Sequence, residues 1–105
     1  MKEGKAVHIE CSIEKELNII GGKWSFFVLR ELLEGTKRFG ELKKAIPKIS
    51  PKALTDTLRQ LEDNEIVTRT VYAPVPVKVE YSLTEKGRAF HKILKEMKRW
   101  EAQWA

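Results

Sequence analysis

The stretch that decides the fold is residues 39–64, FGELKKAIPKISPKALTDTLRQLEDN. Its first part repeats apolar residues at helical spacing and is interrupted at Pro47. Ser50 then supplies a helix N-cap, and Pro51 occupies the first helical position, where its missing N–H costs nothing. The stretch therefore predicts a short helix, a turn and a well-capped second helix, which together form a helix-turn-helix.

The second helix of this pair, predicted to run from its cap to about Asn64, has two different faces. Leu54, Leu58 and Leu61 form an apolar stripe that we expect to be buried. The opposite face is polar, and the DNA major groove accommodates one helix whose exposed polar side chains meet base edges. We therefore predict DNA contacts from this helix by Ser50, Lys52, Thr55, Asp56 and Arg59.

Each of these residue types suits a particular contact with DNA. A guanidinium such as that of Arg59 pairs bidentately with guanine, and Thr55 suits a base edge or a thymine methyl group. Ser50 and the open N–H groups of the first turn suit a phosphate oxygen. Asp56 either accepts a hydrogen bond from cytosine or orients Arg59.

A β-hairpin is predicted directly after the helix pair, over residues 66–83. Residues 66–72 are β-branched and aromatic, and residues 77–83 alternate apolar with polar side chains. The connecting segment, 73–76, contains two prolines that cannot donate to a strand ladder. A hairpin in this position is the wing of a winged helix-turn-helix, so the predicted fold class is α+β, mainly α.

The helices outside this unit are predicted at both ends of the chain. Residues 12–20 and 84–105 have amphipathic patterns, residues 1–10 form an arm, and an apolar helix over 23–34 is expected at the centre. Trp100 and Trp104 are large apolar groups near the C-terminus, and a second subunit would cover them well.

The charge of the chain is concentrated around the helix-turn-helix. The chain has 20 Lys and Arg residues against 15 Asp and Glu residues, for a net charge of +5, and the segment 37–52 holds six bases against one acid. A basic patch on a small domain is what binding to a polyanion requires, although a solvated helix face has the same composition. Phosphate contacts are predicted for Lys23, Arg38, Lys43, Lys44 and Lys78.

Length and composition exclude several other classes of protein. With 105 residues and 12.2 kDa the chain forms a single domain. A single cysteine cannot form an internal disulfide. Cys11, His8 and His91 are too few ligands, and wrongly spaced, for a zinc site, and both histidines are expected at the surface. No apolar run reaches the roughly 20 residues that span a bilayer, and the charged start predicts a cytoplasmic protein. No catalytic constellation, metal motif or cofactor loop is present, so we expect neither an enzyme nor a bound cofactor.

A winged helix that binds protein or RNA, without operator specificity, is the alternative function. Fold alone does not decide between these functions. A protein-binding face exposes apolar anchors, whereas the second helix shows Lys52, Thr55 and Arg59. The polar face favours double-stranded DNA.

Several short segments, in this order and spacing, resemble the HxlR-type family of bacterial and archaeal winged-helix transcriptional regulators, which is related to the MarR group. The segments are Cys11–Glu14, Ile20–Trp24, Leu29–Leu32, Arg38–Leu42, Ile49–Lys52, Leu54–Thr55, Leu58–Glu62, Val71–Tyr72, Pro74, Pro76 and Val79–Gly87. The resemblance covers nearly the whole chain. Ser12 departs from the family, in which proline is common at this position.

The resemblance implies a homodimeric DNA-binding regulator whose first and last helices form the dimer contact. The residues predicted at this dimer interface are Ile13, Leu17, Phe90, Ile93, Met97, Trp100 and Trp104. It also implies a role for Cys11, because several members of the family sense oxidants or electrophiles through a cysteine at the matching position. A thiol just before a helix N-terminus has a lowered pKa, which favours such a role, while a lone cysteine is also often a small buried apolar group. A small-molecule or redox effector is therefore part of the hypothesis.

Overall fold

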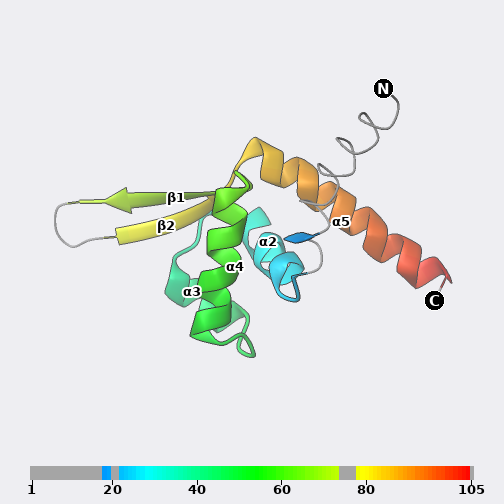
Figure 1. Cartoon of the computed structure of the whole chain (residues 1–105), viewed down its shortest axis with the longest axis horizontal. Coiled ribbons are helices and arrows are strands. Elements are labelled where there is room, and N and C mark those ends of the chain that lie inside the picture. The colour runs from blue at the N-terminus through cyan, green and yellow to red at the C-terminus, as the bar shows by residue number, and fades with distance from the viewer. Residues whose placement is uncertain (1–17, 20–21, 74–77, 105) are drawn as a thin grey trace, which may run out of the picture.

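The computed structural model describes residues 18–19, 22–73 and 78–104. In chain order its elements are α2 (Ser25–Leu33), α3 (Phe39–Ala45), α4 (Pro51–Asp63), β1 (Val67–Tyr72), β2 (Lys78–Leu83) and α5 (Glu85–Trp104) (Figure 1). Helices α3 and α4 form the helix-turn-helix, and the two strands project from it as a wing. The predicted winged helix-turn-helix is confirmed.

Helix α2 lies at the centre of the molecule, where it packs against α3, α4, α5 and β2. Its Val28, Leu29 and Leu32 are buried in one apolar core with residues from every other element. Two of its apolar residues, Phe27 and Leu33, are instead exposed, because a helix at the centre of so small a domain still presents one side to solvent. The other buried apolar residues are Ile19, Leu42, Ile46, Ile49, Leu54, Leu58, Leu61, Ile66, Val67, Leu83, Phe90 and Leu94.

Helix α4 begins at a formed N-cap. The Ser50 hydroxyl accepts a hydrogen bond from the Ala53 N–H at 3.0 Å, and Pro51 is the first helical residue. The three leucines of the predicted stripe, Leu54, Leu58 and Leu61, are all buried. Burial of this stripe fixes the rotation of α4 about its own axis, and its polar face is thereby turned outward.

The wing is an antiparallel pair in which Arg69 faces Tyr81 and Val71 faces Val79. Its base is held to the rest of the domain by a bridge between Lys37 and Tyr81, whose backbone groups exchange hydrogen bonds of 3.0 and 2.8 Å. The base of the wing is therefore fixed relative to the helix-turn-helix.

Helix α5 starts directly against the end of α4. The Thr84 hydroxyl accepts a hydrogen bond from the Gly87 N–H at 2.9 Å and lies 2.7 Å from the Glu65 carbonyl oxygen, to which it donates. The Thr84 N–H donates to the Ile66 carbonyl at 3.1 Å, and Lys86 Nζ donates to the Asn64 carbonyl at 2.9 Å. These contacts tie the first turn of α5 to the segment that joins α4 to β1.

One histidine lies elsewhere than the sequence predicts. His91 is only 5% exposed and stacks on Phe26, with ring centroids 5.9 Å apart and planes 15° apart. It is buried because its position on α5 is next to Phe90 and three residues before Leu94, on the side that packs on α2. The expectation of a surface histidine is wrong for His91, while His8 lies outside the described residues.

Candidate nucleic-acid interface

The exposed face of α4 carries the side chains that the sequence analysis assigns to DNA contacts. The Lys52 side chain is 84% exposed, Arg59 is exposed and Thr55 is half-buried. Lys52 Nζ forms an ion pair with Asp56 Oδ2 at 2.9 Å, one helical turn away. Asp56 therefore pairs with Lys52 and not with Arg59, because Lys52 lies four residues earlier on the same helix face, where oppositely charged side chains meet.

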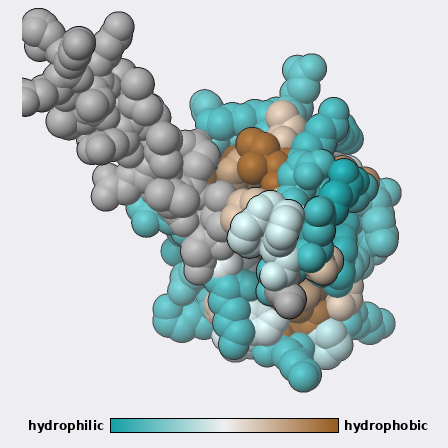
Figure 2. Space-filling model, turned by 90° about the vertical axis from the view of Figure 1, so that its right-hand side faces the viewer, coloured by the Kyte–Doolittle hydropathy of each residue, from teal (hydrophilic) through white to brown (hydrophobic). Residues whose placement is uncertain are grey.

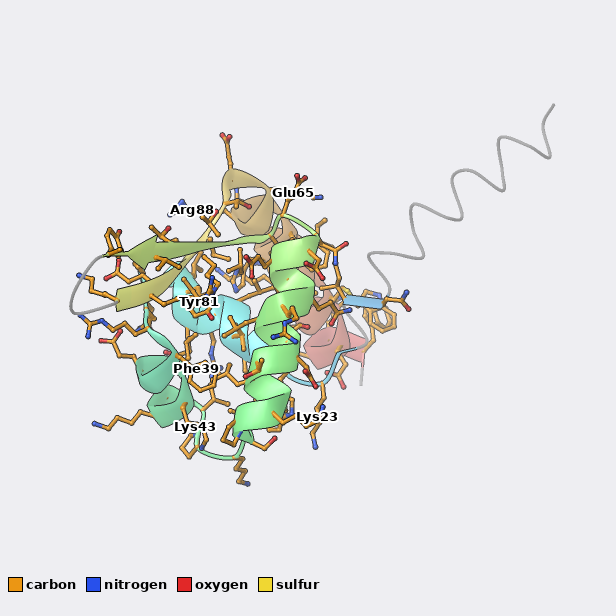
Figure 3. The ribbon with its side chains drawn as sticks, turned by 60° about the vertical axis from the view of Figure 1, so that its left-hand side comes forward. Lys23, Phe39, Lys43, Glu65, Tyr81 and Arg88 are labelled. Carbon is orange, nitrogen blue, oxygen red and sulfur yellow. The ribbon has the colours of Figure 1, made fainter. Side chains whose placement is uncertain are left out.

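Arg59 lies farther along α4, at the mouth of a cleft between this helix and the wing. The cleft has a volume of about 400 Å³ and is lined by Thr55, Leu58, Arg59, Glu62, Arg69 and Tyr81. Figure 3 shows Tyr81 on the wing side of this space, beside α4. Helix α4 and the wing thus share one polar recess.

The predicted phosphate-contacting cations come from three parts of the chain: the segment before α2, helix α3 with the residue before it, and strand β2. Lys43 Nζ donates to the Pro47 carbonyl at 3.2 Å, which holds this lysine beside the turn. Lys44 is exposed on α3 and Arg38 precedes that helix. In the view of Figure 3, Lys43 and Lys23 lie on either side of the N-terminal half of α4.

The two remaining cations are held against aromatic rings. Lys23 Nζ lies 5.1 Å from the centre of the Trp24 ring. Lys78 Nζ lies 5.1 Å from the centre of the Tyr72 ring and 3.4 Å from Glu80 Oε2, on the wing. These contacts restrict each side chain, although the carboxylate of Glu80 neutralises Lys78 in part.

The C-terminal half of α5 carries an exposed apolar face. Trp100 and Trp104 are 65% and 67% exposed, and Ile93 and Met97 are exposed by about half. Phe90 differs from the other predicted interface residues: it is buried in the core of one chain, so it has little surface to offer a second subunit. Figure 2, seen from the side toward which α5 runs, shows apolar side chains gathered among hydrophilic ones.

Beside this face is an apolar groove of about 660 Å³, formed by α5 and α2. Its lining residues are Phe26, Leu94, Met97, Lys98, Trp100 and Glu101. The remaining predicted interface residues, Ile13 and Leu17, lie outside the described residues, as does Cys11.

One titratable group near this face has a shifted pKa. Burial of the ring, followed by the nearby positive charge of Lys95, lowers the pKa of His91 below its ordinary value. Its Nε2 is buried without a hydrogen-bond partner among the described residues. The described part of the chain contains no group of three metal-binding side chains, and none of its helices is long and apolar enough to cross a membrane.

The sequence analysis did not assign a role to Arg69 or Tyr81. Both lie on the face of the wing that is turned toward α4, and they are paired across the two strands. The sequence contained a sign of this position, because alternation along the strand puts Arg69 on the same face as the apolar residues Val67 and Val71. A charged residue between two apolar ones on the same face of a strand departs from the apolar pattern, and this departure could have singled out Arg69.

A family model described as an HxlR-like helix-turn-helix matches residues 19–105. Among curated proteins, the chain is 49% identical over 90 residues to YdeP of Bacillus subtilis, an uncharacterised HTH-type transcriptional regulator. This match covers 86% of the chain and 70% of YdeP.

Solved structures agree with the sequence matches. The reduced form of the transcriptional regulator YodB from B. subtilis superimposes with a TM-score of 0.82 at 41% identity, covering 90% of this chain and 92% of that one. The oxidized form of the redox regulator HypR superimposes with a TM-score of 0.77 at 44% identity, covering 90% and 98%.

Proposed function

We propose, from the premise that this chain belongs to the HxlR-like helix-turn-helix family, that it acts as a homodimer on an inverted-repeat DNA operator. The chain is a DNA-binding transcriptional regulator, and its family is not an enzyme family. We place its action in the cytoplasm, with the chromosome. The proposal adds the oligomer, the symmetry of the site and the residues that contact it.

The observation that carries the proposal is the polar outer face of α4. All three leucines of the helix are buried, so the face that remains presents Lys52, Thr55 and Arg59. A surface for a protein partner would expose apolar anchors. We assign base contacts to Thr55 and Arg59 and phosphate contacts to the surrounding cations.

The dimer is proposed on the exposed face of α5. Two tryptophans and a methionine exposed along one side of a helix form an apolar surface that a second copy would cover. A twofold axis there would place two α4 helices in successive major grooves, about 34–36 Å apart.

Two steps test the proposal. Selection from a pool of randomised duplex DNA at near-physiological salt is expected to enrich a twofold symmetric sequence. Retention of DNA without any enrichment would contradict operator recognition.

Single substitutions then separate base contacts from phosphate contacts. Arg59→Ala is expected to reduce the preference for the selected sequence by about 1–3 kcal/mol. Lys43→Ala is expected to weaken binding to all duplexes alike and to reduce the salt dependence. Equal losses on selected and random DNA in Arg59→Ala would show that Arg59 does not contact bases.

A redox response is a second part of the proposal. Similar structures include HypR in reduced and oxidized forms and YodB after diamide treatment. Cys11 is the only cysteine of the chain, so a disulfide must join two chains or a chain and a small thiol. Non-reducing electrophoresis after diamide treatment, with Cys11→Ser as the control, is expected to show a mixed or intermolecular disulfide, and no change in either protein would contradict this role.

A further inference from the structure

The cleft between α4 and the wing contains two arginines in its lining. Arg59, from α4, and Arg69, from β1, both line it. None of the ion pairs among the described residues uses either arginine, and no side-chain hydrogen bond there occupies them. Two positively charged side chains in the lining of one recess favour an anion there.

The other lining residues suit a phosphate group in particular. Tyr81, whose side chain has a hydroxyl donor, also lines the cleft, and its backbone is held by the two hydrogen bonds to Lys37. The volume of about 400 Å³ equals roughly a dozen water molecules at about 30 Å³ each, enough for a phosphate group and some hydration. Glu62 also lines the cleft, and its carboxylate reduces the net charge of the recess from two positive charges to one.

We infer that this cleft binds one phosphodiester of the DNA backbone, with Arg69 as the main contact and Tyr81 as a second donor. The inference rests on the proposed insertion of α4 into the major groove. When a helix lies in that groove, a sugar-phosphate strand borders it, and the wing beside α4 lies over that strand. Arg69 is assigned to the phosphate because it comes from the wing, whereas Arg59 comes from the helix that enters the groove.

This assignment makes Arg69 a positioning contact. A phosphate clamp between helix and wing fixes how far α4 enters the groove, and it carries no sequence information itself. Because the recess keeps a single net positive charge, we expect free phosphate to bind weakly and DNA to bind through the combination of many contacts.

The test compares Arg69→Ala with a matched control, Arg99→Ala, at several salt concentrations. Arg99 is an exposed arginine on α5 that pairs with Glu96 at 2.9 Å, away from the cleft. Arg69→Ala is expected to lower the affinity for selected and scrambled duplexes by the same factor, and to reduce the slope of log K against log salt by about 1. Arg99→Ala is expected to leave the slope unchanged.

The inference is overturned if Arg69→Ala keeps the wild-type slope, or if it changes the ratio between selected and scrambled DNA. Glu62→Gln supplies an independent arm: removal of the negative charge is expected to tighten binding to both duplexes. Weaker binding in Glu62→Gln would contradict an anion in this cleft. The slope is measured on scrambled DNA as well, so failure of operator selection, which would remove the proposed function, is distinguishable from failure of the clamp.

Neutral methylphosphonate linkages locate the contact. Replacement of one phosphate at a time in the selected duplex is expected to identify a position at which the wild type loses affinity and Arg69→Ala loses none. If no such position exists, the contact is not a backbone phosphate. Protection of the wild type, but not of Arg69→Ala, against thermal unfolding by inorganic phosphate as strong as that given by the same concentration of duplex DNA, at matched ionic strength, would assign the cleft to a free anion and overturn the DNA assignment.

Discussion

Replacement of Gly87 by alanine tests the junction between α4 and α5. A Cβ at this position would lie 2.2 Å from the Ile66 carbonyl oxygen and 3.1 Å from Leu83 Cδ2. Ordinary contact begins at 3.4 Å, so the start of α5 and this carbonyl would have to separate by about 1.2 Å. The obstacle is backbone, which cannot rotate away as a side chain can.

The free energy of unfolding should fall by about 2 kcal/mol. Overpacking against a rigid neighbour costs about 1–3 kcal/mol, and here the upper end applies, because the Ile66 carbonyl also accepts the hydrogen bond from the Thr84 N–H. The higher helix propensity of alanine than of glycine offsets about 1 kcal/mol of this loss in the free energy of unfolding. For a domain of this size the net loss lowers the Tm by roughly 8–16 °C.

Gly40→Ala is the matched control. Gly40 also lies in a helix, α3, but a Cβ there would meet nothing within 4 Å. Its substitution should raise the free energy of unfolding by up to about 1 kcal/mol, since only the unfolded chain loses freedom. Both variants are measured by thermal denaturation followed by circular dichroism at equal protein concentration, because subunit association shifts the Tm. A Gly87→Ala variant as stable as Gly40→Ala would refute the close contact.

Three further substitutions test other features of the structure. The free energy of unfolding of the wild type should fall as the pH drops below about 6.5, because burial lowers the pKa of His91 in the folded chain and the unfolded chain takes up the proton first. His91→Phe keeps an aromatic ring against Phe26 and should reduce this loss in thermal melts at several pH values. Trp104→Ala should raise the dimer dissociation constant at least tenfold in sedimentation at falling concentration, whereas exposed Gln103→Ala should not. Ser50→Ala should cost about 1 kcal/mol in urea denaturation through loss of the N-cap, and an unchanged midpoint would contradict that cap.

The helix-turn-helix was predictable because its signals are local. The N-cap at Ser50, the proline that follows it and the leucine spacing each act within a few residues, and the structure contains all three. The polar face of α4 follows directly from the buried stripe, since one rotation fixes both.

Other features depend on contacts between distant segments, and the sequence pattern did not predict them. His91 is buried because α2 supplies Phe26 as a stacking partner 65 positions earlier in the chain. Phe90 continues the apolar spacing of Ile93 and Met97, yet it is buried with His91 and Leu94 on the face of α5 that packs into the core. The cleft requires α4 and the wing to meet, so no single segment shows that Arg59 and Arg69 share a recess.

The junction at Thr84 and Gly87 connects the two halves of the proposed mechanism. Helix α5 carries the apolar face proposed for the second subunit, and α4 carries the face proposed for DNA. The hydrogen bonds of Thr84 and the close approach of Gly87 to Ile66 fix the start of α5 on the end of α4. In the proposed dimer, the crossing of the two α5 helices would therefore set the separation of the two α4 helices. An effector that changes this crossing would change the spacing between the two half-sites that the dimer can bind. Affinity for the operator would then fall, while the DNA-contacting face of each α4 stays the same.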